Sequence, residues 1–103
     1  MNDQGISVKP TPITAGERVE VSYNGLLAQS GAMEVYLHAG FGMNNLWENV
    51  QDIKMERQGN TWKASLDIET DERFNFCFHD NVGNWDNNNG RNWSFEVHNG
   101  DLY

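Results

Sequence analysis

The sequence predicts an all-β protein, a single antiparallel β-sandwich, from three observations. Apolar and polar residues alternate with a period of two in several short runs, as they do in strands that bury one face. Turn-forming residues separate these runs, for example Gln58-Gly59-Asn60. The length of 103 residues suits one domain with one core. Several short strands with regular turns are typical of a sandwich.

Five alternating runs define the predicted strands. The first run is followed by Asn24-Gly25, a strong turn signal. The predicted strands are residues 18–23, 33–38, 62–68, 74–79 and 93–97. Residues 46–54 are the one segment considered as a short helical turn, and the first few residues are expected to be frayed. No internal repeat or linker interrupts the chain, so we expect one domain over residues 1–103.

The charge balance argues against nucleic acid and membrane partners. Seven Lys and Arg residues against fifteen Asp and Glu residues give a formal net charge of −8, with no basic cluster. Phosphate binding depends on Lys and Arg, so such a surface suits nucleic acid poorly. No stretch is apolar enough to span a membrane, and no secretory signal is visible. The start at Met1 and the short tail after Val97 favour a free-standing protein.

The cysteine and histidine content predicts neither a disulfide nor a metal centre. Cys77 is the single cysteine, which excludes an internal disulfide. His79 and His98 are not spaced as metal ligands with each other or with Cys77, and both are expected on the surface. Residues 80–84 carry oxygen ligands but lack the terminal bidentate Glu of a calcium loop, so a turn is favoured over a structural cation. We expect no cofactor.

The strand phase divides the four tryptophans into two pairs. Trp62 and Trp93 occupy the apolar phase of predicted strands, which indicates core positions. Trp47 and Trp85 lie in Gly- and Asn-rich loops outside any alternating run. Two tryptophans are therefore expected to be structural, and two are available for function.

Trp85 is the strongest candidate binding residue. Its loop, residues 84–90 with the sequence NWDNNNG, is rich in residues that favour turns and contact with water. A sugar ring can pack its C–H face on an indole while its hydroxyls pair with amides and carboxylates. We therefore favour a sugar-binding role over the alternative, a tryptophan that folds back as a lid on the core.

Trp47 and His38 are weaker candidates on pattern alone. Trp47 follows three apolar residues that could form a small satellite core with it, which leaves the structural and binding interpretations equal. These apolar residues are Phe41, Met43 and Leu46. His38 lies on the polar phase of its strand, where an ordinary surface histidine is favoured over a ligand-binding ring.

No catalytic constellation is visible. A glycosidase would need two carboxylates about 5–9.5 Å apart. Glu48, Asp52 and Glu56 resemble a solvated face, and no Ser-His-Asp, Cys-His or phosphate-binding motif occurs. We expect a sugar-binding module that is not an enzyme. The alternatives are a small hydrolase, a protein-interaction sandwich anchored by its exposed tryptophans, and a module for a different glycan.

Five motifs occur in order between about residues 13 and 97. They are residues 16–25 (GERVEVSYNG), 35–41 (VYLHAGF) with Trp47 after it, 59–64 (GNTWKA), 74–80 (FNFCFHD) and 84–88 (NWDNN). Together they resemble the starch-binding carbohydrate-binding modules of family 25, which are related to families 26 and 53.

This resemblance implies an immunoglobulin-like β-sandwich that binds α-1,4-glucans such as starch, glycogen and maltooligosaccharides without catalysis. It implies a platform of one histidine and two tryptophans, with the polar residues after the second tryptophan reaching glucose hydroxyls. The implied carbohydrate-binding residues are His38, Trp47, Trp85, Asp86, Asn87 and Asn88. The implied associate is an amylolytic or glycogen-metabolising enzyme. The location is cytoplasmic for a free-standing protein and extracellular for a module of a secreted amylase.

Overall fold

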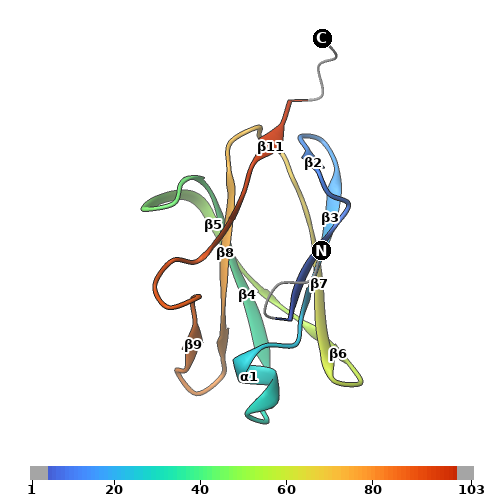
Figure 1. Ribbon diagram of the computed structural model, residues 1–103, viewed down its shortest axis with the longest axis vertical. Helices are drawn as coiled ribbons and strands as arrows, with labels where there is room; N and C mark the ends of the chain where they lie inside the picture. Colours follow the sequence, from blue (N-terminus) through green and yellow to red (C-terminus); the bar gives the residue numbers. More distant parts are fainter. Residues whose placement is uncertain (1–4, 100–103) are drawn as a thin grey trace.

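A computed structural model describes residues 5–99, which form two antiparallel β-sheets that face each other (Figure 1). The first sheet has the order β1 (Ile6–Lys9), β3 (Arg18–Tyr23), β7 (Thr61–Asp67) and β6 (Glu56–Gln58). The second has the order β10 (Trp93–Phe95), β8 (Phe74–Asp80), β4 (Val35–Met43) and β5 (Leu46–Lys54), and β9 (Trp85–Asp86) also pairs with β8. A short parallel pair joins β2 (Ile13–Thr14) to β11 (Val97–His98). The prediction of an all-β antiparallel sandwich is confirmed.

The core lies between the two sheets and is built from the apolar phase of the predicted strands. Strand β3 buries every second residue, ending at Tyr23. The Tyr23 ring stacks on Phe78 of the opposite sheet, with ring centroids 4.0 Å apart. Trp62 and Trp93 keep only 5% and 6% of their surface exposed. The prediction that these two tryptophans are core residues is therefore confirmed.

Residues 46–54 form strand β5, so the helical turn considered for them is wrong. This strand lies at the edge of the second sheet and pairs with β4 through the backbone. Most of its side chains are exposed. Because the fold buries no regular face of β5, its sequence lacks the alternation that marks a strand.

Other boundaries also differ from the prediction. The first few residues, expected to be frayed, lie outside the described residues. Residues 6–9, for which no strand was predicted, pair as β1, and a one-turn helix, α1 (Leu26–Gln29), was not expected. Met33 was assigned to a strand but is 82% exposed, because β4 begins only at Val35. The predicted strand over residues 93–97 is divided into β10 and β11. In the part of the chain that the structure describes, no helix is long and apolar enough to cross a membrane.

The central strand of the second sheet, β8, is buried on both faces. It pairs with β4 on one side and with β9 and β10 on the other. Its inward phenylalanines fill the core, yet its outward residues Asn75 and Cys77 are buried too. Other side chains on the outward face of this sheet therefore shield β8 from solvent, and the candidate site lies on this face.

Candidate functional site

A β-bulge in the second sheet sets which side chains share its outward face. The pairing of β4 with β5 shifts by one residue near Gly40, so that Asn49 and Val50 of β5 both lie opposite this glycine. Asn49 has a φ of 54°, a left-handed conformation that asparagine tolerates. Side chains alternate between faces along a strand, so the extra residue brings Trp47 onto the same face as Asp52.

His38 lies between Trp47 and Trp85 on this face. Its ring centroid is 5.7 Å from that of Trp47, at an interplanar angle of 35°, and 5.2 Å from that of Trp85, at 89°. Trp85 is 51% exposed. The structure thus brings His38, Trp47 and Trp85 together from β4, β5 and β9, and we call these three residues the aromatic platform. The prediction that both tryptophans lie in loops is wrong, because Trp47 lies near the start of β5 and Trp85 begins β9.

Trp47 is held by its own hairpin and by a glycine. Its indole Nε1 donates a hydrogen bond to the Asn44 carbonyl oxygen at 2.8 Å. A Cβ atom at Gly40 would lie 2.9 Å from the Cβ of Trp47 and 3.1 Å from its Cε3, so only glycine permits this approach. Met43 and Leu46 are exposed. The satellite core considered for Trp47 therefore does not form.

A second histidine, His79, supports Trp85. Its ring lies 4.4 Å from Trp85, its cross-strand neighbour. On the other side it stacks on Tyr36 at 5.0 Å with an interplanar angle of 7°. Only 19% of the His79 side chain is exposed. The expectation of an ordinary surface histidine is wrong, because the register places His79 between two aromatic rings.

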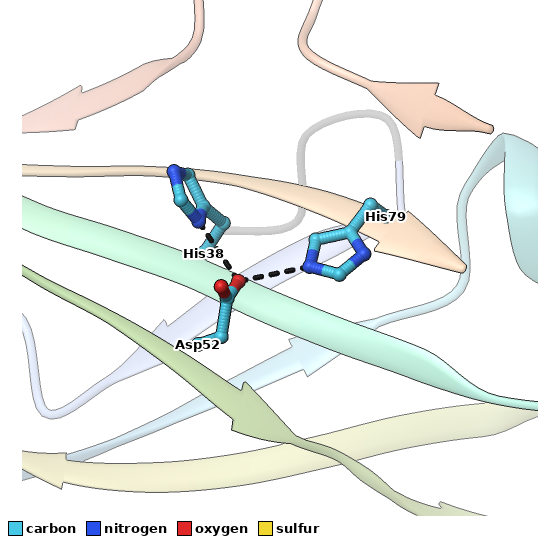
Figure 2. A group of neighbouring side chains, drawn as sticks. All are labelled: His38, Asp52 and His79. Atoms are coloured by element: carbon cyan, nitrogen blue, oxygen red, sulfur yellow. Dashed lines mark hydrogen bonds and ion pairs between the residues drawn. The ribbon is translucent and has the colours of Figure 1, made fainter. Parts of the chain in front are cut away.

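One carboxylate oxygen joins the two histidines, as Figure 2 shows. Asp52 Oδ1 lies 2.8 Å from His38 Nδ1 and 2.8 Å from His79 Nε2. Partial burial raises the pKa of the Asp52 carboxyl, but hydrogen bonds and charge from the two imidazoles outweigh burial, and the net pKa lies below its ordinary value. Asp52 is thus the centre of a cluster that reaches from β5 to β8, and not part of a solvated face.

Asp86 faces away from the aromatic platform. It alternates with Trp85 along β9, and its Oδ2 accepts a 2.6 Å hydrogen bond from the Tyr23 hydroxyl. Burial raises the pKa of the Tyr23 phenol, and the bond to Asp86 raises it further, so the proton stays on Tyr23. The Tyr23 oxygen also accepts the Leu27 N–H at 2.9 Å. Asp86 therefore ties β9 to the core and to α1.

Asn87 and Asn88 are partly engaged within their own loop. Asn87 Oδ1 accepts the Gly90 N–H at 2.9 Å, and Asn88 Nδ2 donates to the Asn92 carbonyl at 3.1 Å. Asn88 has a φ of 58°. These bonds fix the loop after Trp85 and use one side-chain group of each asparagine. The other groups, the Asn87 NH₂ and the Asn88 Oδ1, make no hydrogen bond with another side chain within residues 5–99.

The segment at residues 80–84 is a hydrogen-bonded turn, as favoured from the sequence. Asp80 Oδ2 accepts the Asn84 side-chain amide at 2.8 Å. Asp80 Oδ1 accepts the backbone N–H groups of Asn84 at 2.8 Å and Val82 at 3.0 Å. The Asn84 side chain and these backbone donors hold the pKa of the Asp80 carboxyl below its usual range. A cation here would have to displace these donors.

Comparisons with known proteins place the chain among carbohydrate-binding modules. Residues 19–76 match the profile of the starch/carbohydrate-binding module family 53. The chain is 37% identical over 92 residues to an alpha-amylase of Clostridium acetobutylicum, a match that covers 87% of this chain. Its fold is similar to that of an iodinated family 25 module from a Bacillus halodurans amylase, with a TM-score of 0.58 and 19% identity over 84% of this chain and 89% of that one.

The amylase match is local, since the chain spans 11% of the length of that relative. The resemblance to the group of families 25, 26 and 53 is confirmed. The profile match extends over more than half of the sequence, and the chain belongs to family 53 of the starch and carbohydrate-binding modules, which are not catalytic.

Proposed function

We propose that the aromatic platform binds α-1,4-glucans such as starch, glycogen and maltooligosaccharides. The observation that carries this proposal is the inclination of the two indoles. The plane of His38 makes 35° with Trp47 and 89° with Trp85, so the indole planes differ by at least 54°, the difference between these angles. An inclined pair suits successive glucose rings of a curved α-1,4 chain, whereas a flat β-1,4 chain would contact only one ring well.

His38 supplies the polar contact between the two stacking surfaces. A carboxylate can only accept, so the His38 tautomer that suits this contact has its proton on Nδ1, facing Asp52 Oδ1. His38 Nε2 then carries the lone pair and can accept a glucose hydroxyl. Figure 2 shows this second ring nitrogen turned away from Asp52. We assign further hydroxyl contacts to Asn87 and Asn88, and a positioning role to Asp86.

The site should bind weakly. The aromatic platform lies on the outward face of a sheet, so a bound sugar stays partly hydrated. We expect a binding free energy of about −4 to −6 kcal/mol, which corresponds to dissociation constants from roughly millimolar to tens of micromolar. Such an affinity suits a module that works on a polymer with many repeated sites.

We infer that the natural associate is an amylolytic enzyme. A region of the Clostridium acetobutylicum alpha-amylase is similar to this chain, and the Bacillus halodurans module also comes from an amylase. A weak module that rebinds along starch would keep a linked catalytic domain close to its substrate.

Tryptophan fluorescence tests the ligand class and the site together. We expect a saturable change with maltoheptaose, little change with cellohexaose, and loss of the maltoheptaose response in Trp85→Ala. Met33→Ala is the matched control, since it removes an exposed apolar side chain outside the aromatic platform. Equal binding of both sugars would contradict the α-1,4 assignment, and full binding by Trp85→Ala would contradict the site.

A protein partner is the second candidate, because Trp85 also borders an apolar hollow. Leu26, Met33 and Val82 are exposed, and all three line this hollow with Trp85. Exposed apolar groups that cluster in this way can mark protein interfaces. Met33→Ser and Val82→Ser separate the two functions, because they should leave maltoheptaose affinity unchanged while weakening a protein contact.

A further inference from the structure

We propose that His38, His79 and Asp52 form a binding site for a divalent transition-metal ion, with Zn²⁺ as the expected ion. The three side chains come from β4, β8 and β5, and their ligand atoms lie within 4.8 Å of one another. Two imidazoles and one carboxylate are a ligand set that Zn²⁺ accepts while it keeps a fourth position for water. The site goes beyond sugar binding, because metal binding requires no glucan.

Two of the three distances between the ligand atoms are already close to those around the ion. Two of the contacts, His38 Nδ1 to Asp52 Oδ1 and His79 Nε2 to Asp52 Oδ1, measure 2.8 Å. Ligand atoms around a tetrahedral Zn²⁺ with bonds of about 2 Å lie roughly 3.3 Å apart. Asp52 lies on an edge strand and its side chain is half-exposed. The carboxylate can therefore move outward by a few tenths of an ångström, and the two imidazoles, whose ligand atoms lie within 4.8 Å of each other, must turn toward each other to complete the site.

The other ring nitrogen of His79 provides the second, independent argument. His79 Nδ1 lies 3.0 Å from the Asp80 carbonyl oxygen, which can only accept a hydrogen bond. The Asp52 carboxylate facing Nε2 can also only accept, so a neutral His79, with one ring proton, can donate to one of these two oxygens only. A metal ion between His79 Nε2 and Asp52 Oδ1, with the ring proton on Nδ1 toward the Asp80 carbonyl, would satisfy both contacts. Metal-binding histidines commonly donate their remaining N–H to a carbonyl in this way.

The charges around the cluster also favour a cation. Lys54, on the same face of β5 as Asp52, pairs with Glu34 at 3.7 Å and not with Asp52. Among residues 5–99, the ion-pair partners of Asp52 are His38 and His79 alone. The whole chain carries a formal net charge of −8, which raises the local concentration of cations.

Calorimetric titration of the full chain with ZnCl₂ near neutral pH, without sugar, tests the site. We expect one ion per chain in the wild type, and affinity reduced about tenfold or more in Asp52→Asn and in His79→Gln. His98→Gln is the matched control, because His98 is an exposed histidine on β11, outside the cluster. Cys77 is not used as a control, because it is the cross-strand partner of His38, and His98→Gln should leave the affinity unchanged.

Imidazole NMR signals of the wild type give a readout that does not depend on any variant folding. Zn²⁺ should shift the signals of His38 and His79 and leave those of His98 in place. No heat of binding, an affinity lost in His98→Gln, or shifts at all three histidines would overturn the proposal. Because sugar is absent, none of these results affects the glucan proposal, and a failure of maltoheptaose binding leaves the metal result intact.

Discussion

The two sheets of the sandwich bury similar inward faces but present different outward faces. On the first sheet, the outward positions of β3 and β7 pair polar residues across the strands, such as Glu20 with Ser65 and Ser22 with Lys63. On the second sheet, the outward positions carry aromatic rings that contact one another, including His38 and Trp85. Water hydrates the polar side chains of the first sheet. On the second sheet, the Trp85 side chain is left about half exposed.

In a fold made of two similar sheets, the outward faces indicate where the function lies. Folding requires only the inward faces to be apolar, because the core lies between the sheets. Exposed aromatic rings on one outward face therefore add nothing to the core, and their mutual contacts leave them ordered for a ligand. If the aromatic face is specialised for binding and the polar face is not, substitutions on the two faces should differ in their effect on glucan affinity.

Removal of either indole is expected to have the largest effect on glucan binding. Trp47→Ala and Trp85→Ala should each weaken maltoheptaose binding by about 1–3 kcal/mol, because each removes one stacking surface. The free energy of unfolding should change much less, by about 1 kcal/mol or less, since neither residue is in the core. Isothermal titration and urea denaturation measure the two quantities. Lys63→Ala on the first sheet is the control and should affect neither.

A smaller loss is expected from Gly40→Ala, which adds a methyl group under the aromatic platform. The new Cβ would meet the Cβ of Trp47 at 2.9 Å, and this atom cannot move without shifting the backbone or the indole. Maltoheptaose affinity should fall by about threefold to tenfold, or roughly 0.7–1.4 kcal/mol. Gly83→Ala would be a poor control, because Gly83 has a φ of 91° and alanine would strain the backbone there. Ser65→Ala, outward on β7, is the better control. Unchanged affinity in Gly40→Ala would show that the orientation of Trp47 does not matter.

The division of the tryptophans could be predicted from the sequence, because it depends on local alternation. Trp62 and Trp93 lie in phase with buried residues, and the structure buries them. Trp47 and Trp85 lie outside such runs, and the structure places them beside one histidine. A period of two is a property of each strand alone, so it needs no knowledge of strand pairing.

The supporting cluster could not be predicted, because it depends on pairing between strands. Asp52 meets His38 and His79 only after β5, β4 and β8 are aligned. The bulge at Asn49 then decides that Trp47 shares a face with Asp52, and a shift of one residue would reverse this. Register is set by contacts that are distant in sequence. For the same reason Asp86 was grouped with Trp85, its neighbour in the chain, although it faces Tyr23.

Acid should lower the free energy of unfolding modestly, through protonation of Asp52. Its pKa in the folded state lies below the ordinary value of 3.8, so the folded state binds this proton less tightly than the unfolded state. The resulting stabilisation is complete above about pH 4–5 and is lost as the pH falls through the folded-state pKa. Because the side chain is half-exposed, solvent screening limits it to about 0.5 kcal/mol. Urea denaturation of wild type and Asp52→Asn between pH 2.5 and about 7 should show the two stabilities converging in acid. A constant difference would contradict the assignment.

The smallest effect is expected on the polar face, at the ion pair between Arg18 and Asp67. The two side chains are 63% and 60% exposed, and the atoms Arg18 Nη1 and Asp67 Oδ1 lie 2.8 Å apart. Water and salt screen such a pair, and ordering two long side chains costs entropy, so Arg18→Ala should change the free energy of unfolding by less than about 0.5 kcal/mol. Maltoheptaose affinity should not change, since this pair lies on the other sheet. A clear loss of affinity in Arg18→Ala would mean that the polar face also contacts the glucan, and the contrast between the two faces would then fail. Unchanged affinity, measured beside the loss in Trp85→Ala, would instead restrict glucan binding to the sheet that carries the aromatic platform.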